Sequence, residues 1–141
     1  MRKLELFRDP GSGSNCNFFL SVEIKLQRPN LYLQTPGKID TGAASSVLYY
    51  PDDDLAIREI ENPLGGRTLR CTDGRGLFGK WVSLRIKLEG GEEEYALPVY
   101  LVKQEKTRLV LGSHGFLSRG DLMIFSGEKE PALFYFREIE S

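Results

Sequence analysis

The chain has 141 residues, 40% of them hydrophobic and 28% charged, which is the composition of a globular domain that buries a sizeable core. Its formal net charge of −1 gives no electrostatic reason to expect nucleic acid or an anionic membrane as a partner. No apolar run approaches the ~20 residues that cross a bilayer, and residues 1–14 lack the apolar core of a signal peptide. We therefore expect one domain over residues 1–141, located in the cytoplasm.

Short strands separated by turns are predicted along most of the chain. A strand-like segment at residues 3–7 is followed by residues 18–26, where apolar and polar side chains alternate as in a half-buried strand. The alternation returns at residues 82–88, and residues 94–102 are apolar on both faces, as in a strand inside a packed barrel. Residues 132–139 form the last such segment. Turn signals stand at Asp9-Pro10-Gly11, Pro36-Gly37, Gly65-Gly66, Asp73-Gly74 and Gly90-Gly91.

Helical signals are weak. Residues 51–59 begin with proline followed by acids, which suits one short turn, and residues 112–119 have the composition for one or two turns. Cys16 and Cys71 stand far apart without CxxC spacing, so neither a zinc site nor a disulfide framework is predicted, and no metal or cofactor is expected. Many short strands at this spacing predict an all-β fold, either a closed β-barrel or a sandwich.

The tripeptide Asp40-Thr41-Gly42 is the segment least typical of ordinary packing. It follows a predicted strand, whose interior disfavours aspartate and glycine, and small side chains come after it. The tripeptide is either a plain turn or a loop that holds a carboxylate for a chemical purpose. A Gly-rich candidate hairpin follows over residues 67–82, and farther along the apolar run 109–111 leads into Gly112.

This order of motifs resembles the retropepsin-like aspartic proteases, in particular their prokaryotic, non-viral branch. Asp40-Thr41-Gly42-Ala43 is similar to the catalytic loop of that family, Val110-Leu111-Gly112 to the apolar element beneath the loop, and Gly115-Phe116-Leu117 to the short helix that follows. The resemblance covers residues 18–136. It implies an all-β, closed β-barrel of retropepsin (acid protease) type, with a flap hairpin over about residues 67–82 and one short helix near the C-terminus.

The same resemblance implies an aspartic endopeptidase, which hydrolyses peptide bonds with water activated by paired carboxylates. One carboxylate takes a proton from water while the other donates one to the carbonyl oxygen, and two carboxylates about 3 Å apart keep one proton between them. The chain holds one such tripeptide, so the pair requires a homodimer in which each subunit contributes Asp40. We expect association through terminal strands at about residues 2–8 and 132–139, and a peptide or protein as substrate.

The resemblance assigns the site residues individually. Asp40, Thr41 and Gly42 are the expected catalytic residues, with Thr41 hydrogen-bonding across the dimer interface. No metal ligand is expected. The expected substrate-binding residues, four of them on the flap, are Ala43, Val110, Asp73, Gly74, Arg75 and Gly76.

Three positions depart from the family's pattern. Lys38 stands where an apolar residue is common, and Ala44 and Ser113 stand where viral members carry an acid and an arginine that form an ion bridge. Since both partners of that bridge are absent together, the dimer is expected to rest on its terminal strands.

Other interpretations of these residues stay open. Asp40 could be a turn aspartate or the relic of a lost enzyme, and the chain would then be a non-catalytic peptide-binding or scaffold module with the same fold. The hairpin over residues 67–82 could be an ordinary one. His114 is expected on the surface, Cys71 as a small buried hydrophobe and the acids at residues 52–54 in a solvated turn. A nucleic-acid-binding barrel is disfavoured by the net charge.

Overall fold

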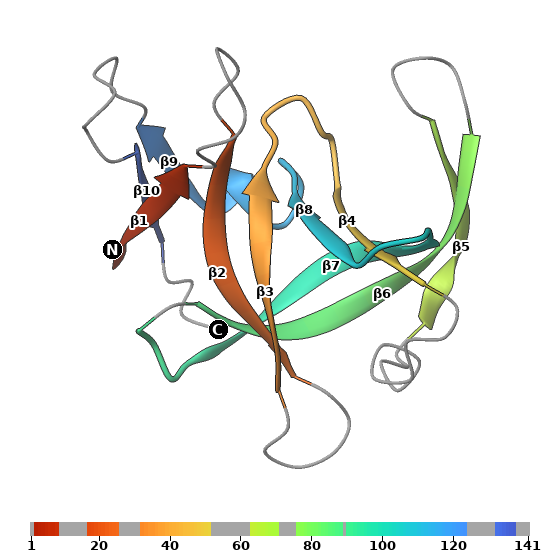
Figure 1. The fold of residues 1–141 in the computed structure, drawn as a ribbon, viewed down its shortest axis with the longest axis horizontal. Coiled ribbons are helices and arrows are strands. Elements are labelled where there is room, and N and C mark those ends of the chain that lie inside the picture. Colours follow the sequence, from red (N-terminus) through yellow and green to blue (C-terminus); the bar gives the residue numbers. More distant parts are fainter. Residues whose placement is uncertain are drawn as a thin grey trace.

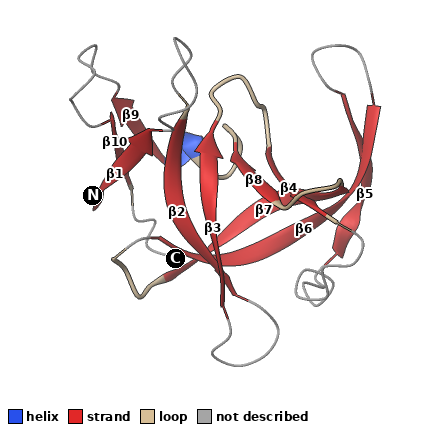
Figure 2. Ribbon diagram, viewed as in Figure 1, coloured by secondary structure: helices blue, strands red, loops and turns tan. Residues whose placement is uncertain are grey.

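The computed structural model describes residues 2–8, 17–25, 32–51, 63–70, 76–88, 90–123 and 132–137. Strands, drawn in red in Figure 2, make up most of these residues. In chain order, and as labelled in Figure 1, they are β1 (Arg2–Arg8), β2 (Phe18–Lys25), β3 (Tyr32–Ile39), β4 (Ser46–Tyr50), β5 (Pro63–Arg70), β6 (Gly76–Leu88), β7 (Glu94–Lys103), β8 (Arg108–Leu111), β9 (Gly120–Met123) and β10 (Ala132–Phe136). Between β8 and β9 lies a single turn of 3₁₀ helix, η1 (Leu117–Arg119).

Six of these strands close into a barrel. They are hydrogen-bonded in the order β6-β7-β4-β8-β3-β2, and β2 pairs again with β6, so that the six strands form a ring. β5 extends β6 into a hairpin on one side, while β1, β10 and β9 continue the sheet from β2 on the other. Figure 1 shows the β5–β6 hairpin and the β1, β9 and β10 strands at opposite sides of the molecule. The all-β fold and the closed barrel predicted from the sequence are confirmed.

The barrel encloses the main hydrophobic core. Its alternating strands turn every second residue inward, as the sequence pattern predicts. A buried side chain of this kind contributes about 1.5–3 kcal/mol on removal from water. The inward residues of β2 and of the barrel part of β6 are Phe18, Leu20, Val22, Ile24, Val82, Leu84, Ile86 and Leu88.

The last strand, β10, lies between two strands of the same chain. It pairs antiparallel with β1 on one side and with β9 on the other. Its residues Phe134 and Phe136 are fully buried and pack against Phe116. Both hydrogen-bonding sides of Ala132–Phe136 are thus occupied within the chain, and β9 ends the described sheet. Association of two copies through the terminal strands stays a prediction. Residues 138 and 139 of the expected strand lie outside the described residues.

Two of the predicted turns lie inside strands. Pro36-Gly37 belongs to β3, where a Cβ on Gly37 would lie 2.7 Å from Cδ1 of Leu111. Glycine leaves room there for a leucine side chain of the neighbouring strand, which lies close to the backbone. Gly65-Gly66 belongs to β5, whereas Gly90-Gly91 does form the turn between β6 and β7. The remaining predicted turns, including Asp73-Gly74, lie outside the described residues.

Helical structure in the described residues is confined to η1. The one or two turns predicted over residues 112–119 are reduced to this 3₁₀ turn, in which the N–H of Arg119 donates to the carbonyl of Phe116 (2.9 Å). Of the short helix predicted at residues 51–59, the structure describes Pro51 alone. The described part of the chain contains no helix that is both long and apolar enough to cross a membrane.

Candidate active site

The predicted catalytic tripeptide lies where three strands meet. β8 lies between β3 and β4, parallel to the first and antiparallel to the second. The chain leaves β3 at Ile39 and enters β4 at Ser46, so the loop of residues 40–45 crosses the end of β8 (Figure 1). This strand order, which no local pattern encodes, decides the position of Asp40.

Asp40 is fixed by backbone hydrogen bonds. Its N–H donates to the carbonyl of Leu111 (3.1 Å), which continues the β3–β8 ladder by one residue. Its carbonyl accepts from the N–H of Ala43 (3.2 Å), and its carboxylate oxygen Oδ1 accepts from the N–H of Gly42 (3.0 Å). The last contact is the local bond by which aspartate stabilises a tight turn. This bond orients the carboxylate. Because Asp40 is only half-buried, its carboxylate still reaches solvent.

The residues after β8 hold the loop from the other side. Three successive backbone N–H groups donate to the carbonyls of Ala43 and Ala44 (both 2.9 Å) and to the buried hydroxyl of Ser46 (3.0 Å). A Cβ on Gly112 would overlap the carbonyl of Ser45, so a larger residue fits only if the loop moves. The apolar-apolar-glycine element predicted beneath the loop therefore lies where close backbone approach requires glycine.

Some of the predicted site residues come together and others are not described. Thr41 and Gly42 are exposed on the loop, and Ala43 is half-buried. Val110, 8% exposed, lies on β8 at the centre of the sheet beneath the loop. Gly76 is the first residue of β6 and belongs to the β5–β6 hairpin. The flap residues that lie outside the described residues are Asp73, Gly74 and Arg75.

A second apolar cluster, which the sequence analysis missed, lies on the outer side of the sheet. The strand register places Trp81, Tyr100, Val47, Val110 and Lys38 side by side across β6, β7, β4, β8 and β3. The rings of Trp81 and Tyr100 pack with their centroids 4.3 Å apart. The apolar character of β7 on both faces was the sequence signal for such a cluster, since a strand with one solvated face alternates. Lys38 ends the row at the strand that leads into the tripeptide.

His114 connects this cluster to the loop. The residue is exposed, as expected, but its ring stacks on Trp81 with the centroids 6.1 Å apart. Its backbone pairs with Ser45 in an isolated bridge beside the loop. The outer cluster and the loop of Asp40 are therefore neighbours.

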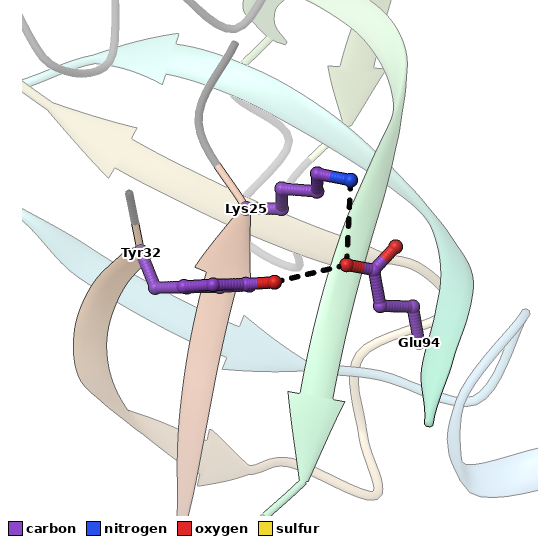
Figure 3. Close-up of polar contacts among 3 residues, drawn as sticks. All are labelled: Lys25, Tyr32 and Glu94. Carbon is purple, nitrogen blue, oxygen red and sulfur yellow. Dashed lines mark hydrogen bonds and ion pairs between the residues drawn. The ribbon is translucent and has the colours of Figure 1, made fainter. Parts of the chain in front are cut away.

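At the opposite end of β3, polar side chains pair with one another (Figure 3). The hydroxyl of Tyr32 donates to Oε1 of Glu94 (3.1 Å), and Nζ of Lys25 lies 3.4 Å from the same oxygen. Partial burial raises the pKa of Glu94, but the hydrogen bond from Tyr32 and the charge of Lys25 outweigh it, so that the pKa is lowered. The hydrogen bond with Tyr32 raises the pKa of Lys87, whose ammonium lies 4.4 Å from the centre of that ring.

Comparison with known proteins supports the fold more than the chemistry. The chain is similar to a retropepsin-like aspartic protease from Rickettsia conorii, with a TM-score of 0.59 at 12% identity over 96% of this chain and 91% of that one. A protein of unknown function from Legionella pneumophila aligns over 70% of this chain and 84% of its own, at 21% identity, with a TM-score of 0.37 that is too low to bear on the fold. No family model and no curated protein matches the sequence.

The first of these matches defines the class of fold. The chain forms an all-β, closed barrel of retropepsin type, extended by the β5–β6 hairpin and with one short turn of helix before the last strands. At 12% identity the likeness extends to the fold alone. Among the described residues, no three His, Cys, Asp or Glu side chains gather in the manner of a metal site.

Proposed function

We propose that the chain is an aspartic endopeptidase that works as a homodimer, each subunit contributing Asp40. The observation that supports this proposal best is the state of the carboxylate. The N–H of Gly42 orients it, it remains half-buried on an open loop, and in the described part of the chain it forms no ion pair. A carboxylate that only stabilises a turn needs the hydrogen bond from the backbone. It needs neither access to solvent nor freedom from an ion pair.

The proposed reaction uses two carboxylates that share one proton. The ionised Asp40 takes a proton from water as the water oxygen attacks the carbonyl carbon of the peptide, and the protonated Asp40 of the partner subunit gives its proton to the carbonyl oxygen. Collapse of the tetrahedral intermediate breaks the C–N bond, and the nitrogen leaves with a proton from the same pair. The two groups titrate as a unit because neither can ionise independently of the other.

The remaining predicted residues receive supporting roles in this proposal. Thr41 would bind the opposite loop across the two-fold axis, and the backbone at Gly42 and Ala43 would approach the substrate. The β5–β6 hairpin would close over the bound peptide and exclude water. Val110 would contribute apolar contact. The hairpin residues assigned to substrate binding are Asp73, Gly74, Arg75 and Gly76.

Asp40→Asn tests the proposal directly. An amide cannot act as general base, so the variant should lose cleavage of a peptide library by at least ~10³-fold while its unfolding curve and its sedimentation stay those of the wild type. Glu92→Gln, which removes an exposed carboxylate from the β6–β7 turn, serves as the control and should cleave normally. Cleavage by Asp40→Asn at the wild-type rate would exclude the mechanism, and a wild-type protein that binds peptides without cutting them would favour the non-catalytic module.

A further inference from the structure

Asp40, at the end of β3, and Arg108, on the adjacent strand β8, lie on the same outer side of the sheet. Ile39 points into the core, so its neighbours Lys38 and Asp40 point outward by alternation. On the adjacent strand the outward residues are Val110 and Arg108, since Leu109 and Leu111 are buried in the core.

The distance between Asp40 and Arg108 can be counted in residues along β8. The parallel register of β3 and β8, with Ile39 opposite Leu111, sets Asp40 level with Gly112, one residue beyond the end of β8. Arg108, at the start of that strand, lies about 13 Å away along it at ~3.3 Å per residue. An extended peptide covers that distance in about four residues, so a peptide positioned at Asp40 reaches Arg108 with one of its side chains.

Arg108 is held in place by an aromatic ring. Its guanidinium carbon lies 4.7 Å from the ring centroid of Tyr49, which is opposite it in the register of β4 and β8. Tyr49 is itself half-buried against the outer cluster formed by Val47, Tyr100 and Val102. A guanidinium that lies over a ring keeps the N–H groups of its edge available, and that edge matches the two oxygens of a carboxylate.

A cavity lies at the exposed end of this arrangement. It measures about 440 Å³, and its described lining residues are Gln104, Glu105, Lys106 and Arg108. The N–H of Gln104 donates to the carbonyl of Tyr50 (2.8 Å), which ties the lining segment to the end of β4. Among the lining residues that the structure describes, two cations stand against one anion, and Arg108 forms no ion pair with another described residue.

We infer that this cavity is a specificity pocket that takes an acidic side chain, glutamate or aspartate, of a bound peptide, with Arg108 as the group that recognises the carboxylate. Its role in selecting what is cut rests on the proposed peptidase function, but its preference in binding does not. Lys106 adds to the positive potential of the pocket, and Glu105 opposes it. The outer cluster supplies a rigid support, since Tyr49 cannot turn away without leaving its packing.

The cleavage test uses two peptides that differ by one residue, Glu in one and Gln in the other, at each of four positions on either side of the cut. At one position the wild type should prefer the Glu peptide by ~10-fold in kcat/KM, the effect of one charge-assisted hydrogen bond. Arg108→Gln should bring this ratio close to one. Arg85→Gln removes the same charge from an exposed position on β6 and should keep the ratio of the wild type. Equal ratios for wild type and Arg108→Gln would overturn the inference.

A binding test separates this inference from the proposed chemistry. In the Asp40→Asn background, fluorescence anisotropy of labelled peptides should show the same ~10-fold preference for Glu over Gln, lost on adding Arg108→Gln and weakened by salt. Glu105→Gln should strengthen binding of the Glu peptide, because the substitution removes a negative charge that repels the peptide carboxylate. Preference in binding without any cleavage by the wild type would support the pocket and overturn the peptidase. Cleavage or binding without preference would overturn the pocket alone.

Discussion

The two ends of β3 carry polar side chains in opposite situations. At the first end, Tyr32, Lys25 and Glu94 satisfy one another through side-chain contacts of 3.1 and 3.4 Å (Figure 3). At the other end, Asp40 receives one backbone N–H on its carboxylate, and its loop is held by main-chain bonds. Polar groups that pair with one another stabilise a surface. A carboxylate oriented by the backbone keeps capacity for another partner, which is what a group that transfers protons needs.

This difference predicts where the molecule is sensitive to substitution. Around Asp40 the loop depends on backbone contacts with the residues after β8, among them the buried bond from Gly112 to Ser46, so changes at these contacts should be costly. Around Tyr32 the contacts are partly solvated, and water can replace them at small cost. Three substitutions test this contrast through the free energy of unfolding.

The largest effect is expected for Gly112→Ala. The added Cβ overlaps the carbonyl of Ser45, which belongs to the loop backbone and cannot rotate away, so the free energy of unfolding should fall by about 2–4 kcal/mol. Urea unfolding followed by far-UV circular dichroism measures the loss. Gly42→Ala is the control, because its Cβ would lie 3.4 Å from Oδ1 of Asp40, an ordinary contact. A similar loss in both variants would show that the close approach at Gly112 is unimportant.

Ser46→Ala should have the second largest effect. Its hydroxyl is fully buried and accepts the N–H of Gly112 at 3.0 Å, so the variant leaves that N–H without its partner and should lose about 1–3 kcal/mol. Ser21→Ala, whose hydroxyl accepts from Gln34 at an exposed position, should lose less than about 0.5 kcal/mol in the same urea titration. If the two losses are equal, the loop does not depend on this buried bond.

The smallest effect is expected for Glu94→Gln, at less than about 1 kcal/mol because the ion pair is partly exposed. The pKa of Glu94 is lowered in the folded state, so its ionised form adds stability above its usual pKa, and this is lost as the pH falls through the folded value. The variant should therefore be less stable than the wild type at neutral pH and equal to it at strongly acidic pH. Thermal unfolding at both conditions, with Glu92→Gln as the control, measures the difference. If Glu94→Gln lowered the free energy of unfolding as much as Ser46→Ala does, the two ends of β3 would not differ in their sensitivity to substitution.

Local periodicity predicted the barrel strands well. β2 and the barrel part of β6 alternate buried and more accessible residues as their sequence does, because one face of each meets the core and the other does not. Turn chemistry predicted less reliably. Pro36-Gly37 and Gly65-Gly66 carry turn residues and lie in strands, since pairing with neighbouring strands overrides a local preference worth about 1 kcal/mol.

The terminal strand shows the same limit. The apolar pattern of residues 132–139 predicted a strand, but it could not show which strands would flank it. The structure supplies β1 and β9 from the same chain, and Phe134 and Phe136 complete the core with Phe116. Where a dimer forms remains a prediction, with β9 as the strand that ends the described sheet on this side.

The sequence by itself determined which segments are strands, that they make an all-β fold, and that Asp40-Thr41-Gly42 departs from ordinary packing. Those properties depend on neighbours in the chain, through side-chain alternation and backbone preference. The tertiary structure alone decided that β8 lies between β3 and β4, that Ser46 accepts the N–H of Gly112, and that Arg108 lies over Tyr49. Each of these contacts joins strands distant in sequence, and their register is set by closure of the barrel as a whole.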